Sequence, residues 1–388
     1  MTTETRGLAP PSRLADRLDA VRAALAADGL DGLVVSHLPH LYYLLNLRAS
    51  AGLAIVGTDP GDLTLIVDFR YAEAVDRLQS AGFMPPGLDV VPVPADGTYD
   101  GTLASHLRAS GSRRRVGIES DHYSVRRWSW LTRALGGSVE LVPSADLVER
   151  ARMVKDTHEI ALFRAAGHML ADVVAPATAA TRAGRTELEV AREIDAVLQA
   201  TGFEALAFET IVATGPNGAL PHAHPGERRI EEGDLVLLDF GGVHHRYCVD
   251  LSRTVAVGTI PDEARRLHDA VAEAQAAAIA AAVPGVRASE VDAAARAALE
   301  RHDLADAFGH STGHGLGIEV HELPRIGRRR VSGEGETDDA VLAPGMVFTI
   351  EPGVYVPGFG GVRIEDDVLM TEDGPEVLTT PTDLHTTR

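Results

Sequence analysis

Residues 233–255 read GDLVLLDFGGVHHRYCVDLSRTV, two largely apolar runs that each contain one aspartate and that flank a short polar segment. Such runs on either side of a turn predict an antiparallel β-hairpin. If the turn is centred between His244 and His245, Asp239 and Asp250 lie directly opposite each other, with Cβ atoms about 4.5–5.5 Å apart. Like charges at that separation are destabilising unless a cation lies between them. For either acid alone, a position capping a turn or facing solvent on an edge strand is the favoured explanation.

A second hairpin repeats the arrangement further along the chain. Residues 348–367 read FTIEPGVYVPGFGGVRIEDD, and a turn around Gly358 places Glu351 opposite Glu365. Each acid again follows a largely apolar run, which predicts burial. Two acid-paired hairpins in one domain are hard to explain without a cation.

A histidine-rich segment lies between the two hairpins. Residues 310–325 read HSTGHGLGIEVHELPR and contain His310, His314 and His321. A lone histidine of this kind is usually structural, but three beside four buried acids favour a functional site. The glycines at 313, 315 and 317 are expected to let the backbone approach a ligand closely.

Four carboxylates and one imidazole form a hard, oxygen-rich ligand set. Such a set suits two divalent ions of the Mn²⁺ or Co²⁺ kind better than a structural zinc site. Two ions about 3.5–4 Å apart can activate water and polarise a carbonyl group together. The predicted reaction class is therefore metal-assisted hydrolysis of a carbonyl compound.

The rest of the chain predicts two domains. Residues 1–150 alternate helices with short β-branched strands, which indicates an α/β domain, and residues 1–12 are expected to be a flexible tail. Residues 151–388 are expected to be α+β, with antiparallel hairpins and covering helices. A strand is expected within LVERARMV (147–154), and the predicted helices span 157–180, 187–200, 262–282 and 288–302. Pro176 could kink or shorten the first of these helices.

Composition limits the kinds of binding partner and the cellular location expected for the chain. The chain has 388 residues, of which 45% are hydrophobic, and its formal charge is −20, which disfavours nucleic acid as a partner. Its one cysteine, Cys248, excludes an intrachain disulfide. The N-terminus lacks a secretory signal and no uninterrupted apolar run is long enough to span a membrane. We therefore expect no membrane association and a cytoplasmic location.

Five motifs follow one another in this order: LLDFGG (237–242), YCVDLSRT (247–254), STGHGLGIEVHE (311–322), TIEPGVY (349–355) and GVRIEDDVLMTEDGPEVLT (361–379). In this combination the chain resembles the catalytic domain of the metal-dependent Xaa-Pro peptidases, prolidase and aminopeptidase P. The resemblance runs from residue 154 to residue 380 and implies the pita-bread fold shared with methionine aminopeptidase and creatinase. The N-terminal domain resembles, more weakly, the creatinase-type domain that precedes the catalytic unit in these enzymes. The family resemblance also implies a homodimer.

The resemblance implies two divalent metal ions, with Mn²⁺ the first candidate and Co²⁺ or Zn²⁺ the others. The implied ligands are Asp239, Asp250, His314, Glu351 and Glu365. Asp250 and Glu365 would contact both ions, whereas His314 would contact one.

The resemblance also implies roles for residues around the ligands. His321 matches a histidine that stabilises the tetrahedral intermediate or shuttles a proton, and Glu351 is the candidate general acid–base. His222, within ALPHAHPG (219–226), matches a histidine that lines the substrate pocket. The remaining substrate-binding candidates are His310, Arg325, Tyr355 and Arg363.

The implied activity is hydrolysis of the bond between an N-terminal residue and proline in a small peptide. Arg325 could bind the C-terminal carboxylate of a dipeptide, so prolidase and aminopeptidase P both remain open. Methionine aminopeptidase shares the five ligands, but the extra N-terminal domain argues against it. Hydrolysis of another amide or C–N bond, or a non-catalytic pita-bread binding module, are the further alternatives.

Overall fold

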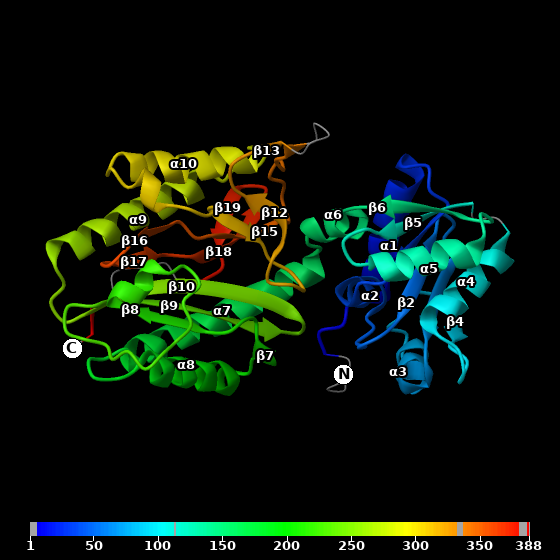
Figure 1. The fold of residues 1–388 in the computed structure, drawn as a ribbon, viewed down its shortest axis with the longest axis horizontal. Coiled ribbons are helices and arrows are strands. Elements are labelled where there is room, and N and C mark those ends of the chain that lie inside the picture. Colours follow the sequence, from blue (N-terminus) through cyan, green and yellow to red (C-terminus); the bar gives the residue numbers. More distant parts are fainter. Residues whose placement is uncertain (1–5, 112–113, 332–336, 380–385, 388) are drawn as a thin grey trace. The chain divides into compact units, whose positions relative to one another are not determined.

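The computed structural model describes residues 6–111, 114–331, 337–379 and 386–387. The chain divides into two compact units, Met1–Arg152 and Met153–Arg388. The first is α/β and the second α+β, so the expected fold classes are confirmed (Figure 1).

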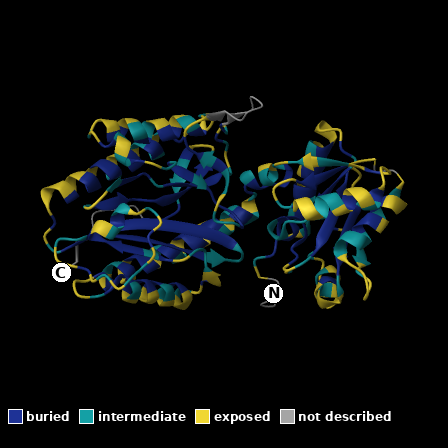
Figure 2. Cartoon of the chain, in the orientation of Figure 1, coloured by how far each residue is buried: buried dark blue, intermediate teal, exposed yellow. Residues whose placement is uncertain are grey.

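A six-stranded mixed sheet forms the centre of the first unit. The elements in chain order are α1 (Pro11–Ala27), β1 (Gly32–Val35), α2 (Leu38–Leu45), β2 (Leu53–Gly57), β3 (Leu63–Val67), α3 (Phe69–Ser80), β4 (Asp89–Pro92), α4 (Tyr99–Ser110), β5 (Arg115–Glu119), α5 (Val125–Leu135), β6 (Glu140–Ser144) and α6 (Leu147–Met153). The strand order is β4-β3-β2-β1-β5-β6. Strands β1, β2 and β3 are buried at every position, as is typical of a sheet covered on both faces (Figure 2).

Two expectations for this unit are wrong. The tail expected over residues 1–12 already packs from Leu8 and Ala9, which are buried, and α1 begins at Pro11; residues 1–5 lie outside the described residues. The backbone amide of Ala9 donates to Asn46 Oδ1 at 3.0 Å, which fixes this segment. The strand expected within LVERARMV is helix α6, because Leu, Glu, Arg, Ala and Met are strong helix formers.

The second unit contains two larger sheets. Its elements are α7 (Thr157–Ala180), α8 (Glu187–Thr201), β7 (Ala205–Leu206), β8 (Ile211–Thr214), η2 (Gly215–Ala219), β9 (Leu235–His244), β10 (Tyr247–Val257), α9 (Asp262–Ala281), α10 (Ala288–Glu300), η3 (Ala305–Ala307), β11 (Gly313–Gly315), β12 (Glu322–Ile326), β13 (Arg330–Val331), β14 (Thr337–Asp338), β15 (Val347–Ile350), β16 (Gly353–Val356), β17 (Gly360–Arg363), β18 (Asp366–Thr371), β19 (Gly374–Val377) and β20 (Thr386–Thr387). One sheet has the order β20-β10-β9-β7, with β8 also paired to β9, and the other has the order β12-β11-β15-β18-β19. Two short ribbons, β13–β14 and β16–β17, complete the unit.

Helices cover the outer faces of these sheets. Helix α7 contacts β9 and β10, whereas α9 contacts β15, β16 and β17 on the other side of the unit (Figure 1). The alanine-rich faces of α9 and α10 pack with Phe348, Ile350 and Val368 in one apolar core. Strand β10 also contacts β17 and β18, so the inner faces of the two halves meet in the interior of the unit.

Helix α7 carries a clear local signal at its start. It begins with a capping box, in which the Asp156 side chain accepts from the amides of His158 and Glu159 and the Glu159 side chain accepts from the amide of Asp156. The helix continues through Pro176 to Ala180 without being shortened. By length and composition alone it could cross a membrane, but it packs against α8, β9 and β10, as core helices of globular proteins do.

Candidate active site

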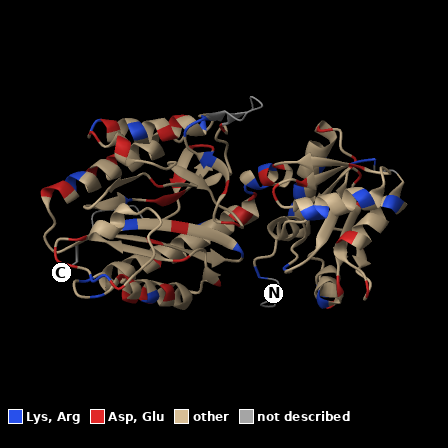
Figure 3. Ribbon diagram, viewed as in Figure 1, with Lys and Arg blue, Asp and Glu red and all other residues tan. Residues whose placement is uncertain are grey.

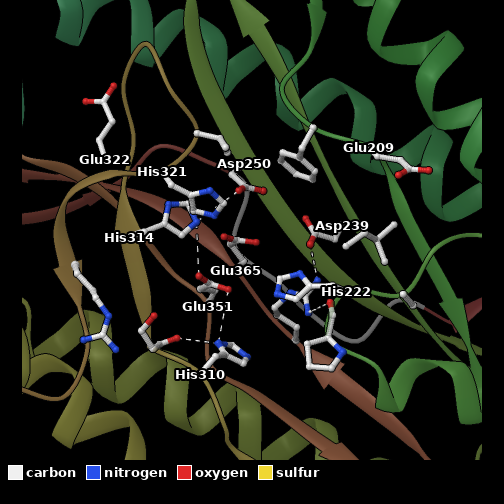
Figure 4. A pocket seen from close by; sticks show the side chains of 18 of the residues that line it. Glu209, His222, Asp239, Asp250, His310, His314, His321, Glu322, Glu351 and Glu365 are labelled. Atoms are coloured by element: carbon white, nitrogen blue, oxygen red, sulfur yellow. Dashed lines mark hydrogen bonds and ion pairs between the residues drawn. The ribbon is translucent and has the colours of Figure 1, made fainter. Parts of the chain in front are cut away.

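The predicted site residues surround one cavity of about 590 Å³ within the second unit. It lies between the β9–β10 hairpin, the β11–β12 segment and the β15–β18 region. Figure 4 shows Asp239, Asp250, His314, Glu351 and Glu365 from these segments pointing toward one another. Figure 3 shows acidic residues on the interior strands of this unit, and several of these acids are buried. A buried acid needs a hydrogen-bonding partner or a cation.

The register of the first hairpin differs from the sequence expectation. Asp239 pairs with Ser252, and Asp250 pairs with Gly241, so the two acids are diagonal neighbours rather than directly opposed. The turn is centred between His245 and Arg246, one residue further along the chain than expected. Both residues adopt positive φ, 48° and 75°, as a type I′ turn requires. Asp250 lies two residues from Ser252, the partner of Asp239, and side chains alternate between faces with a period of two. Both carboxylates therefore still lie on the same face of the hairpin.

The second hairpin has the expected register. Ile350 pairs with Asp366 and Gly353 pairs with Arg363, which leaves Glu351 and Glu365 facing each other between the two ladders. The backbone amide of Glu351 donates to the carbonyl of Thr312 at 2.7 Å, which ties this strand end to the histidine segment.

His314 is directed at the acids by its own backbone. Its Nδ1 donates to the carbonyl oxygen of Gly315 at 3.1 Å, so Nε2 is the nitrogen left to face the cavity. Nε2 lies 3.8 Å from Asp250 Oδ2 and 3.6 Å from Glu351 Oε1. Burial lowers the pKa of His314 to about 4, which keeps the ring neutral and able to donate its lone pair.

Close packing of neighbouring strands requires two glycines of the histidine segment. A Cβ on Gly313 would lie 1.8 Å from the carbonyl oxygen of Thr349, and one on Gly315 would lie 2.2 Å from that of Leu323. At Gly317 a Cβ would meet the side chain of Glu322. Gly313 and Gly315 are glycine because neighbouring backbone approaches β11 closely.

Buried oxygens without partners indicate that the site is built for cations. Asp239 Oδ1 and Asp250 Oδ1 are buried and have no hydrogen-bond partner among the described residues. Ligand atoms of Asp250, His314 and Glu365 all lie within 4.8 Å of one another. The donor set, with carboxylates in excess over one imidazole, fits divalent ions that prefer oxygen.

The pKa values of the acids agree with this fit. Burial, followed by the charges of neighbouring acids, raises the pKa of both Asp250 and Glu365 well above the usual value. Burial raises the pKa of Glu351 to about 8. A bound divalent cation would remove the repulsion that holds these protons in place.

A hydrogen-bonded chain runs behind the ligands. Arg363 forms an ion pair with Asp239 and also donates to Tyr355 Oη at 2.8 Å. His310 Nδ1 donates to the Ser311 carbonyl at 2.8 Å, which leaves His310 Nε2 to accept from the Tyr355 hydroxyl at 2.9 Å. Burial lowers the pKa of His310 to about 4 and raises that of Tyr355 to about 12. Tyr355 therefore acts as both acceptor and donor in the chain.

The remaining predicted residues line the same cavity. The ring centroid of His321 lies 4.3 Å from that of His314, and burial lowers the pKa of His321. His222 and Arg325 also line the cavity, and Arg325 Nη1 donates to the carbonyl of Arg328 at 3.0 Å. The structure thus brings all eleven predicted side chains to one cavity or its immediate wall.

Sequence reasoning missed the buried groups that support the ligands. Asp367 Oδ2 accepts from the amide of Asp250 at 3.1 Å, and Ser252 Oγ donates to Glu365 Oε2 at 2.7 Å. Arg253 is 1% exposed and donates to the Glu365 carbonyl at 2.5 Å and to Asp366 at 2.7 Å. Asp366 and Asp367 directly follow Glu365 on an apolar strand, and this run of acids is the sequence signal that could have pointed to the supporting groups.

The apolar wall of the cavity was also missed. Phe208, Ile211, Pro221 and Val320 line it beside the polar groups. They come from loops and strand ends that carry no chemical motif, so the sequence offered no signal for them.

Comparison with known proteins agrees with this geometry. Residues 161–372 match metallopeptidase family M24, and residues 17–154 match the creatinase/prolidase N-terminal domain. The chain belongs to metallopeptidase family M24. The expected resemblance and the fold of a creatinase-type domain followed by a pita-bread catalytic domain are thereby confirmed.

Individual relatives cover nearly the whole chain. An uncharacterized peptidase of Bacillus subtilis is 35% identical, over 94% of this chain and 97% of its own. The solved structure of an Xaa-Pro dipeptidase from Bacillus anthracis has a TM-score of 0.87 and 32% identity, over 96% of this chain and 100% of its own. An X-Pro aminopeptidase from Thermotoga maritima has a TM-score of 0.80 and 30% identity, covering 92% and 98% respectively.

Proposed function

We propose that this chain hydrolyses the peptide bond between an N-terminal residue and proline, with two divalent metal ions held by the predicted ligands Asp239, Asp250, His314, Glu351 and Glu365. The observation that carries the proposal is the meeting of two acid-bearing hairpins and the His314 imidazole at one cavity. Solved relatives named as an Xaa-Pro dipeptidase and an X-Pro aminopeptidase support the substrate class. When bound, the ions supply water activation and polarisation of the scissile carbonyl.

The side chains around the ligands have separate tasks in this proposal. Glu351 accepts a proton from the attacking water and passes it to the proline nitrogen, which as a tertiary amide carries no hydrogen of its own. His321 donates a hydrogen bond to the oxygen on which negative charge develops. Water is excluded from the cavity wall near His321 by Phe208, Pro221 and Val320. His222 lines the part of the cavity that would hold the substrate.

Arg325 would decide between a dipeptidase and an aminopeptidase. It lines the cavity, where it can bind the free carboxylate of an Xaa-Pro dipeptide. Replacement by glutamine (Arg325→Gln) should then raise KM for Xaa-Pro about ten- to a hundredfold, and leave KM for Xaa-Pro-amide nearly unchanged. Equal effects on both substrates would contradict a carboxylate-binding role.

The finer properties of the enzyme follow from the same reasoning. We propose Mn²⁺ as the physiological metal because the ligand set is rich in oxygen, with Co²⁺ and Zn²⁺ as alternatives. Family resemblance supports a homodimer. The single, buried cysteine supports a reducing, cytoplasmic compartment.

Metal depletion and restoration test the proposal. The full chain, stripped of metal by a chelator, is given Mn²⁺, Co²⁺ or Zn²⁺ and assayed on Xaa-Pro, Xaa-Pro-Yaa and Xaa-Ala peptides. We expect metal-dependent cleavage of proline peptides by wild type and by the exposed-acid control Asp269→Asn, and loss of cleavage in Asp250→Asn. Activity that persists without metal would contradict the metal mechanism. Bound metal without cleavage of proline peptides would contradict the substrate class.

A further inference from the structure

Three histidines gather in the first unit, far along the chain from the predicted metal ligands. His37 precedes α2, His40 lies in its first turn, and His122 lies in the turn between β5 and α5. The rings of His37 and His122 stack with centroids 3.6 Å apart, and the centroid of His40 lies 4.7 Å from that of His37. One ring nitrogen from each lies within 4.8 Å of the other two.

His40 is the buried member of this cluster, with a side chain that is 0% exposed. Its Nδ1 lies 2.6 Å from Glu119 Oε1. Because a carboxylate can only accept a hydrogen bond, Nδ1 carries the proton. His40 Nε2 is buried and has no hydrogen-bond partner among the described residues. An unpaired nitrogen in such a place costs free energy unless a ligand satisfies it.

A carboxylate completes the set of donors. Glu149, on α6, places Oε1 3.6 Å from His40 Nε2 and within hydrogen-bond distance, 3.2 Å, of His122 Nε2. The 3.6 Å separation is too long for a hydrogen bond, and a neutral nitrogen gains nothing from facing a carboxylate oxygen. A cation between these atoms would satisfy both of them.

Glu119 acts as an outer partner that fixes the orientation of His40. Its Oε2 accepts from the amide of Ser36 at 2.6 Å, from Ser36 Oγ at 2.9 Å and from the amide of His37 at 2.9 Å. A carboxylate held in this way, bonded to the far nitrogen of an imidazole, is the arrangement that orients histidine ligands in metal sites.

We propose that the three histidines and Glu149 bind a divalent transition-metal ion of the imidazole-preferring kind, for which Zn²⁺ is the best match. Three imidazole nitrogens, with the Glu149 carboxylate beside two of them, form a nitrogen-rich set, in contrast to the carboxylate-rich cavity of the second unit. The ion would join α2, the β5–α5 turn and α6. This site is independent of the proposed peptidase activity.

Metal counting on the full-length, Mn²⁺-loaded protein tests the site. The protein is dialysed against micromolar Zn²⁺ with Mn²⁺ in excess, and total metal per chain is measured by mass spectrometry. We expect His122→Ala to hold about one metal ion per chain fewer than wild type. The control His302→Ala removes another histidine paired with a glutamate, at 2.6 Å from Glu273, and should keep the wild-type count.

A second variant and a second readout keep the test decisive. Glu149→Gln keeps the side-chain shape and should also lose the additional ion. Zn²⁺ should raise the thermal unfolding midpoint of wild type and of His302→Ala, but not of His122→Ala or Glu149→Gln. Equal metal content in wild type and both variants would overturn the proposal.

Discussion

The hydroxyl group of Tyr355 links Arg363 to His310 in the active-site wall. It accepts from Arg363 Nη1 at 2.8 Å and donates to His310 Nε2 at 2.9 Å. In Tyr355→Phe, His310 Nε2 therefore loses the donor that satisfies it. We expect the free energy of unfolding to fall by about 1–3 kcal/mol, as measured by urea denaturation of the metal-loaded enzyme.

The control for this prediction is Tyr71→Phe, which removes a hydroxyl that bonds to Ser50 at 2.6 Å on the exposed surface. Water can replace that bond, so little stability should be lost. An equal loss in both variants would contradict the role of Tyr355 as a buried link.

Residue chemistry explains how much of the site could be predicted. The acids and His314 stand out because charged groups within apolar runs are rare and demand a partner. Arg253 and Asp367 give a weaker signal, since an ion pair or a hydrogen bond within the core could explain them equally well. Glu149 and His122 carry no local pattern at all, because only the fold brings them to His40.

Secondary-structure elements were predicted best where caps and periodicity agree. Helix α7 spans Thr157–Ala180 as expected, since a capping box fixes its start. The register of the first hairpin was missed because His245 and Arg246 adopt positive φ without the glycine or asparagine that usually marks such a turn. The second hairpin was placed correctly because Gly358, with φ of 78°, marks the centre of its turn.

The β11 strand offers a prediction about close backbone packing. A Cβ on Gly313 would lie 1.8 Å from the Thr349 carbonyl oxygen, so Gly313→Ala must push β11 away from β15 and move the adjacent His314. We expect a loss of about 1–3 kcal/mol in the free energy of unfolding. We also expect weaker metal binding, measured by titration of the metal-free protein with Mn²⁺.

Gly309→Ala is the matched control for this change. No heavy atom lies within 4 Å of the Cβ position at Gly309, and its φ is not in the left-handed region. This variant should keep both stability and metal affinity. If Gly313→Ala behaved in the same way, the close approach of the two strands would not be what positions His314.

For the whole molecule, the buried titratable groups predict how the stability of the metal-free protein depends on pH. Glu351 has a pKa of about 8 when folded and 4.5 when unfolded, so between these values the folded state holds a proton that the unfolded state has released. That group lowers stability as pH rises. His310 and His314, lowered from 6.5 to about 4, act in the opposite direction, but only below pH 6.5.

Between about pH 6.5 and pH 8, these histidines no longer change the free energy of unfolding, and only the buried carboxyl groups lower it as pH rises. The free energy of unfolding in chelator should fall by about 1.4 kcal/mol per pH unit for each such carboxyl. Urea denaturation across this range measures the slope, and Mn²⁺ should abolish it. Glu351→Gln should show a shallower slope than wild type. A stability that rises with pH in chelator would contradict the burial of these acids as protonated groups.

At the scale of the whole chain, the alternation of helices and strands followed by paired hairpins predicted both fold classes. The arrangement of layers around the cavity could not be predicted in the same way. It depends on contacts such as those of β10 with β17 and β18, between segments more than a hundred residues apart. Long-range packing of this kind leaves no trace in local sequence.

The spacing of the acidic hairpins has a consequence for biosynthesis. A ribosome adds residues in order, so Asp239 and Asp250 emerge well before Glu351 and Glu365. A nascent chain that ends between the hairpins holds only two of the four carboxylates, which cannot offset the charge of two divalent ions. If the proposed ligands hold two ions, metal loading must wait until the second hairpin has been synthesised and folded onto the first, and a chain that stalls between the hairpins lacks half of the proposed ligand carboxylates.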